Sequence, residues 1–148
     1  MPDNFNSDLE VVLRREVKDF QALDSCKQLT AGASQETYRI TLSTEAGQRH
    51  LALRRSTLDT PSSVGTISLA TEASLFQLAR ANQIPGPAIV YVLRPEDRMG
   101  AGFLMEWLEG ETLGQRIVRA PEFEAVRARL ASSCGEILGR IHSLNWRE

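Results

Sequence analysis

The stretch that decides the fold is LALR at residues 51–54, and two further stretches follow it along the chain. A helical segment at 66–81 carries Glu72 in its middle, and the sequence FLMEWLEG occupies residues 103–110. Together they place a cation, Arg54, on a strand, a carboxylate on the next helix, and an apolar strand that runs into a short linker with glycine. This order of elements predicts an α+β arrangement of layers.

Alternation along the strand sorts the residues around the cation. Ala52 and Arg54 share one face, while the other face carries Leu51, Leu53 and Arg55. A small residue beside a cation suits a nucleotide cleft, because it leaves room for a flat base while the cation meets the phosphates. The planar guanidinium suits bidentate phosphate contact, and an acid on the next helix can hold it through an ion pair. The alternative is an exposed Arg-Arg pair on an edge strand, with the acid on a solvated helix face.

Two further segments complete the candidate site. Residues 30–35 form a turn of small residues between two predicted strands. Its backbone N–H groups and the Ser34 hydroxyl can meet a phosphate; the alternative is an ordinary hairpin connection. The linker after the apolar strand can present backbone groups to the edge of an adenine. In this interpretation Met105 forms the back wall, and the Glu106 C=O and Leu108 N–H make the hydrogen bonds; the alternative is a core strand followed by a turn.

The first half of the chain mixes helical and strand patterns. Apolar residues at steps of three and four predict an amphipathic helix from Ser7 to about Asp24, and Ser7 with Glu10 has the spacing of a capping box. A short strand is predicted at 26–29, followed by the small-residue turn at 30–35 and a strand at 36–43. A hairpin turn at 44–48 leads to the return strand at 50–55, and a mobile loop follows at 57–65.

The second half is predicted to be helical except for two strands. The helix at 66–81 is followed by strands at 88–93 and 101–107, and the second of these is nearly all apolar, which predicts burial on both faces. Thr112 and Gln115 have capping-box spacing for a short helix, and Pro121 suits the first turn of a long last helix. The apolar stripe of that last helix comprises Phe123, Val126, Leu130, Cys134, Ile137, Leu138 and Ile141.

Composition limits the class of protein. A chain of 148 residues with 42% hydrophobic and 24% charged residues is typical of one soluble globular domain. A net charge of −2 argues against nucleic-acid binding. The sequence has no secretory signal and no apolar run of roughly 18 residues that would span a membrane, so we expect a cytoplasmic location. Cys26 and Cys134 fit no metal or disulfide spacing and are interpreted as small buried hydrophobes.

Five short segments, taken together, resemble the aminoglycoside phosphotransferase-like branch of the protein-kinase-like fold. They are LTAGASQETYR at 29–39, LALRR at 51–55, Glu72-Ala73, FLMEWLEG at 103–110 and LGRIH at 138–142. The resemblance covers about residues 25–145, and the nearest group is that of predicted phosphotransferases, which includes domains fused to acyl-CoA dehydrogenases. It implies an α+β fold: a kinase-like small lobe, with a five-stranded antiparallel sheet and one crossing helix, followed by helices of an incomplete large lobe.

The resemblance also implies an organisation and a site. The N-terminal helix spans 1–24, the nucleotide-binding small lobe 25–108, and the linker with the truncated start of the helical large lobe 109–148. Arg54 lies where the family binds phosphate, and Glu72 lies at its helical partner. His142 is interpreted as a packing or hydrogen-bonding histidine. The implied site for ATP or GTP comprises Ser34, Ala52, Arg54, Glu72, Met105, Glu106 and Leu108.

The sequence departs from the family after the last of these segments. The family continues with a His-Gly-Asp loop, an Asn and a metal-binding Asp, which position the acceptor and hold Mg²⁺. This sequence has no aspartate after Asp97. We therefore expect no catalytic residue and no metal ligand here, with Mg²⁺ bound only in the complete enzyme. The chain is interpreted as a truncated gene product, a fragment or a decayed relative.

The sequence supports hypotheses from different classes of protein. The first is the ATP-binding portion of a small-molecule kinase, which in the complete protein transfers the γ-phosphate of a nucleotide to a substrate hydroxyl. The alternative is a non-catalytic interaction module or truncated pseudokinase fragment, which meets a second copy or a partner chain through the apolar stripe of the last helix. A third is an unrelated α+β domain in which Arg54 and Glu72 never meet. No residue indicates the phosphate acceptor.

Overall fold

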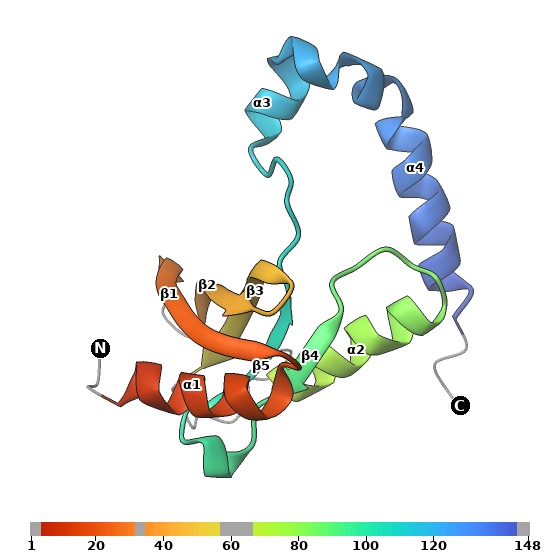
Figure 1. Ribbon diagram of the computed structural model, residues 1–148. Coiled ribbons are helices and arrows are strands. Elements are labelled where there is room, and N and C mark those ends of the chain that lie inside the picture. Colours follow the sequence, from red (N-terminus) through yellow and green to blue (C-terminus); the bar gives the residue numbers. More distant parts are fainter. Residues whose placement is uncertain (1–3, 32–34, 57–66, 145–148) are drawn as a thin grey trace. The chain divides into compact units, whose positions relative to one another are not determined.

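A computed structural model of the chain describes residues 4–31, 35–56 and 67–144 (Figure 1). The chain forms two compact units. The first contains Met1–Gln77 and Pro87–Trp107 and holds the whole sheet. The second contains Leu78–Gly86 and Leu108–Glu148 and is helical in its described part. The predicted loop at 57–65 lies outside the described residues.

The first unit is built on five antiparallel strands, which confirms the predicted sheet. In spatial order they are β1 (Phe20–Ala31), β2 (Glu36–Thr44), β3 (Gly47–Ser56), β5 (Ala101–Glu106) and β4 (Ile89–Val92) (Figure 1). The predicted hairpin turn joins β2 to β3, where Gly47 has a φ of 113° that favours glycine. Because β3 lies in the centre of the sheet, the alternative of an arginine pair on an edge strand is wrong.

The face of the sheet that carries Leu51 and Leu53 is covered by α1 (Phe5–Glu16). Alternate residues of β2 are buried there, as predicted from their spacing. Four apolar residues of α1 complete this core against the strands: Phe5, Leu9, Val12 and Leu13. Burial of apolar surface on this face is the main stabilising contribution to the unit.

The prediction that the first helix continues to Asp24 is wrong. The helix ends at Glu16, Asp19 adopts a left-handed conformation with a φ of 62°, and β1 begins at Phe20. The chain reverses at this point, so Phe20 and Leu23 reach the same core from a strand. The predicted capping box is also wrong, because the helix begins at Phe5 and its N-cap makes no side-chain hydrogen bond.

The opposite face of the sheet is partly covered by α2 (Leu69–Ala81). Leu69 and Ala73 of this helix form a small buried cluster with Phe103 of β5. Glu72 lies in the first turn of α2 rather than in its middle, because the helix starts three residues later than predicted. Gly102 allows β5 to lie close to β3, since a Cβ atom at this position would come within 2.5 Å of the Arg54 carbonyl oxygen.

The turn between β4 and β5 is anchored to α1 through a buried carboxylate. It contains a short 3₁₀ helix, η1 (Pro95–Asp97). Asp97 accepts hydrogen bonds from Arg15 at 2.9 Å, from Tyr91 at 2.9 Å and from the Arg94 N–H at 2.8 Å. Burial alone would raise the pKa of Asp97, but these hydrogen bonds outweigh it, so the pKa lies below its usual value.

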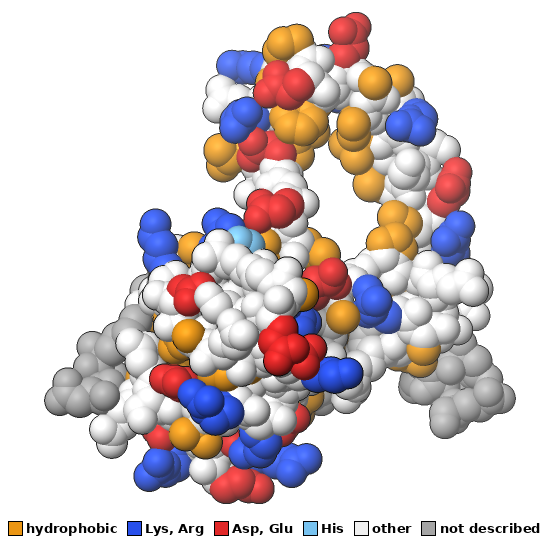
Figure 2. Space-filling view, in the orientation of Figure 1, with side chains coloured by type: hydrophobic (Ala, Val, Ile, Leu, Met, Phe, Trp, Pro, Cys, Tyr) orange, Lys and Arg blue, Asp and Glu red, His pale blue; other side chains and the backbone are white. Residues whose placement is uncertain are grey.

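The second unit contains α3 (Gly114–Arg119), η2 (Pro121–Phe123) and α4 (Glu124–His142). The capping box predicted for α3 is wrong, since its N-cap is Leu113 and makes no side-chain hydrogen bond. Arg127 of α4 ties these helices together by donating to the carbonyl oxygens of Ile117 and Ala120. Apolar side chains lie at the surface of α3 and α4 (orange in Figure 2).

Two interpretations of single residues need correction. Cys134 is exposed on α4, and Cys26 is only partly buried, so neither is the fully buried residue predicted. Burial nevertheless raises the pKa of the Cys26 thiol to about 11, despite the opposing effect of Arg55. His142 is exposed at the end of α4, and its role stays a prediction.

Candidate phosphate-binding site

The cation predicted from LALR is held between two side chains on the face opposite α1. A guanidinium nitrogen of Arg54 lies 3.3 Å from a carboxylate oxygen of Glu72, and another donates to the Gln35 side-chain oxygen at 2.6 Å. The side chains of Arg54 and Glu72 are 36% and 19% exposed, so the ion pair is partly screened by solvent. This geometry confirms that the two groups meet, and it excludes the hypothesis of a domain in which they do not.

One nitrogen of this guanidinium keeps an unused donor. The Nε atom of Arg54 is buried and has no hydrogen-bond partner among the residues that the structure describes. A buried donor without a partner costs free energy. A ligand oxygen that accepted this hydrogen would remove the cost, so the arrangement fits an anionic group.

The floor beside Arg54 is apolar and small. Ala52 lies opposite Met105 in the neighbouring strand, and Arg54 lies opposite Phe103. Because side chains alternate along each strand, all four point to the face away from α1. Ala52 is only 4% exposed, while Met105 is partly buried against the cluster formed by α2.

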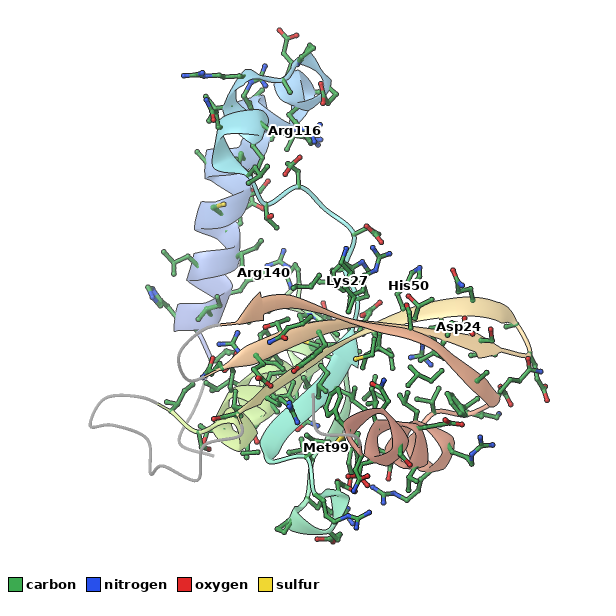
Figure 3. The ribbon with its side chains drawn as sticks, turned by 90° about the vertical axis from the view of Figure 1, so that its left-hand side faces the viewer. Asp24, Lys27, His50, Met99, Arg116 and Arg140 are labelled. Carbon is green, nitrogen blue, oxygen red and sulfur yellow. The ribbon has the colours of Figure 1, made fainter. Side chains whose placement is uncertain are left out.

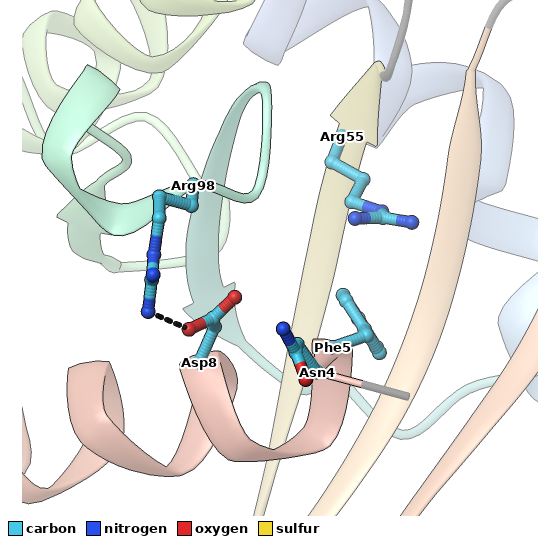
Figure 4. A pocket seen from close by; sticks show the side chains of 5 residues that line it. All are labelled: Asn4, Phe5, Asp8, Arg55 and Arg98. Carbon is cyan, nitrogen blue, oxygen red and sulfur yellow. Dashed lines mark hydrogen bonds and ion pairs between the residues drawn. The ribbon is translucent and has the colours of Figure 1, made fainter. Parts of the chain in front are cut away.

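The adjacent arginine of β3, Arg55, points to the α1 face of the sheet and is part of the core there. Arg55 is buried on the α1 side, where it donates a hydrogen bond to the Glu36 carboxylate at 2.8 Å. Its guanidinium carbon lies 4.2 Å from the centroid of the Phe5 ring. Arg55 lines a pocket of about 260 Å³ near the start of α1 (Figure 4). Asp8, which also lines this pocket, is engaged by Arg98 at 2.7 Å. This pocket therefore lies on the other side of the sheet from the candidate site.

The predicted linker residues fall at the boundary between the two units. The Glu106 N–H donates to the Ala88 carbonyl oxygen, and the Glu106 carboxylate accepts from the Ala88 N–H, which fixes the end of β5. Leu108 belongs to the second unit. Ser34 lies outside the described residues. The structure thus brings together Ala52, Arg54, Glu72 and Met105, and it also fixes Glu106 at the end of the same sheet.

Sequence reasoning missed two contacts on this face. Gln35 follows the small-residue turn and binds Arg54, but no pattern marks a glutamine as the partner of a distant arginine. Arg39 of β2 lies opposite Ala52, and its guanidinium carbon is 4.7 Å from the centroid of the Trp107 ring. The alternation of β2 could have placed Arg39 on this face, whereas nothing in the sequence connects it to Trp107.

The described part of the chain offers no metal centre. Among residues 4–31, 35–56 and 67–144, no three His, Cys, Asp or Glu side chains come together in a way that could hold a metal ion. These residues therefore do not fit the Mg²⁺ that a kinase-like fold implies. Within the same residues no helix is both long and apolar enough to cross a membrane.

The sheet, its crossing helix and the Arg54–Glu72 pair define a kinase-like small lobe followed by the start of a helical large lobe. A sequence model of the phosphotransferase enzyme family (APH) matches residues 25–148. Because the match covers more than half of the chain, the chain belongs to this family. No curated protein matches it at a significant level.

Proposed function

We propose that the sheet unit binds the phosphates of ATP or GTP through Arg54, as the nucleotide-binding portion of a kinase that phosphorylates a hydroxyl of a small molecule. The observation that carries this proposal is the Arg54–Glu72 pair with its buried, unused Nε donor. A permanently charged, planar guanidinium in a fixed position is suited to bidentate phosphate contact. Membership of the phosphotransferase family supports a nucleotide as the source of the phosphate.

The remaining site residues are assigned around this cation. The base lies over Ala52 and Met105, and the backbone of Glu106 and Leu108 reads its edge. Ser34 and its neighbours in the turn contact the phosphates. Mg²⁺ neutralises phosphate charge when kinases bind it, but the described residues bring no ligands for it, so we place nucleotide binding in them and not turnover.

Titration with a fluorescent ATP analogue tests this function directly. The Arg54→Ala variant should bind the analogue about ten- to a hundredfold more weakly, because a charge-assisted hydrogen bond is lost. Arg49→Ala is the matched control, since it removes the same charge from an exposed position of the same strand. Equal affinities for the wild type and Arg54→Ala would contradict the proposal.

A second candidate function is an interaction module that pairs with another copy of the chain through α4. The observation that favours it is the apolar stripe, in which Val126, Leu130, Leu138 and Ile141 are between 42% and 52% exposed. The dependence of molecular mass on protein concentration tests this function.

A further inference from the structure

Arg39 lies in a row of residues that crosses four strands on the face of the candidate site. Along this row Lys27 of β1 lies opposite Arg39, Arg39 opposite Ala52, and Ala52 opposite Met105. The neighbours of Arg39 in β2, Tyr38 and Ile40, are buried in the core with α1, so Arg39 points the other way. Lys27, in the same row, lies on the side of the sheet away from α1 (Figure 3).

The Arg39 side chain reaches past its neighbour to the end of β5. Its guanidinium carbon lies 4.7 Å from the centroid of the Trp107 ring, and Trp107 follows Met105 by two residues. Strands β2 and β5 are separated by β3 alone, a span of about 9.5 Å from strand to strand. A side chain that spans this gap crosses β3 on the face that carries Ala52, which lies opposite Arg39.

Ala52, on the strand that this side chain crosses, is little exposed. Ala52 does not belong to the core under α1 or to the cluster against α2, yet it is 4% exposed. The small residue that would leave room for a base is therefore covered by the chain itself. A guanidinium and a purine are both planar and delocalised, and both stack on an indole.

From these observations we infer that Arg39 is a gate over the base site, which closes on Trp107 without nucleotide and swings away when a purine binds. The base then takes the place of the guanidinium against Trp107 and over Ala52. The inference rests on the proposed function, because it assigns a regulated entrance to the same site. Opening the gate breaks the cation–π contact, so the closed state weakens binding of the base.

Adenosine is the probe of choice because it carries a purine but no charge. Arg39→Ala should bind adenosine about three- to thirtyfold more tightly than the wild type, which is the range that a lost cation–π contact allows. Lys27→Ala is the matched control: it removes one exposed cation from the same row and should leave adenosine affinity unchanged. Circular dichroism shows whether each variant keeps the fold.

Tryptophan fluorescence reports the gate itself. The chain has two tryptophans, so Trp146→Phe leaves Trp107 as the only one. In that background Arg39→Ala should change the emission of Trp107 before any ligand is added, and adenosine should quench it. An unchanged emission spectrum would overturn the contact between Arg39 and Trp107.

The two proposals fail in different ways. If ATP binds in an Arg54-dependent manner but Arg39→Ala binds adenosine equally or more weakly than the wild type, the gate is wrong and the proposed function stands. If neither the wild type nor Arg39→Ala binds ATP, the proposed function is wrong, and the gate proposal, which rests on it, is wrong as well. Tighter adenosine binding by Arg39→Ala, without change in Lys27→Ala, supports the gate, whereas ATP binding that depends on Arg54 supports the proposed function.

Discussion

At the scale of single residues, strand alternation gives two adjacent arginines opposite roles. Arg54 meets Glu72 on the face of the candidate site, whereas Arg55 is buried with Glu36 under α1. Arg55 lies in a core where its charge is paired and stacked on aromatic rings, so it is a structural group. Arg54 is partly exposed and has a buried donor to spare among the described residues, which suits ligand binding.

A double-mutant cycle measures how much the interaction between Arg54 and Glu72 contributes to the free energy of unfolding. Arg54→Ala, Glu72→Ala and the double variant should give a coupling energy of about 0.5–1 kcal/mol in urea unfolding, because both side chains are partly screened by water. The cycle of Arg54→Ala with Glu96→Ala is the control and should be additive, since Glu96 is exposed on η1, in the turn that is anchored to α1. A coupling of zero for the first cycle would contradict the ion pair.

The sequence predicted Arg54 and Glu72 as partners only when the order of strand and helix was joined to the family resemblance, because a strand's period of two by itself places Arg54 on a face and names no partner. It was not sufficient for Gln35 or for the contact of Arg39 with Trp107. Those contacts depend on the order of strands in the sheet, in which β5 lies next to β3 and places Trp107 within reach of β2. Periodicity along one strand carries no information on that order.

At the scale of elements, the apolar spacing that predicts α1 continues into the first strand, so the spacing alone does not show where the helix ends. Phe20 and Leu23 continue the helical spacing of α1, but they reach the same core from β1. The chain turns at Asp19, an acid in a left-handed conformation that short polar side chains tolerate. As an edge strand with register shifts, β1 also lacks the clean alternation that would have identified it.

The link between α1 and the β4–β5 turn gives the unit a pH dependence. Asp97→Asn should lower the unfolding free energy at neutral pH by about 2–3 kcal/mol, because hydrogen bonds to a buried charge are weakened. The pKa of Asp97 is lower in the folded chain than in the unfolded chain. Its stabilising contribution is therefore complete above the unfolded value of about 3.9 and is lost as the pH falls through the folded value.

Urea unfolding followed by circular dichroism between neutral and acidic pH checks this prediction. The gap in unfolding free energy between wild type and Asp97→Asn should narrow as the pH falls below about 4. The control is Glu96→Gln, the exposed acidic neighbour, which should follow the wild type at every pH. A gap that stays constant into the acid range would show that the charge of Asp97 contributes nothing.

At the scale of the whole molecule, the family match and the structural units do not share their boundaries. The match begins at residue 25, yet α1 and the first part of β1 lie before it and fill one face of the sheet. The predicted boundary between a separate N-terminal helix and the small lobe therefore divides a continuous core. The sheet needs the helix because alternate residues of β2 and β3, together with one residue of β5, present large apolar side chains to it: Tyr38, Ile40, Leu42, Leu51, Leu53 and Leu104.

The apolar stripe of α4 supports a prediction about assembly. In an antiparallel pair of α4 helices the stripes of the two copies face each other, and each copy presents the same apolar residues to its partner. The wild type should therefore dimerise as its concentration rises, because the pairing buries the exposed Leu130, Val126 and Leu138.

A charge placed within the stripe tests this pairing. Leu130→Asp should abolish association, because it buries a charge in the centre of the stripe. Arg129→Asp is the matched control: it places the same acid at an exposed position on the polar side of α4, about 115° around the helix from the stripe, and should leave the dimer intact. Analytical ultracentrifugation of the three proteins measures this directly. A wild type that stays monomeric, or a Leu130→Asp variant that still dimerises, would rule out this arrangement of α4.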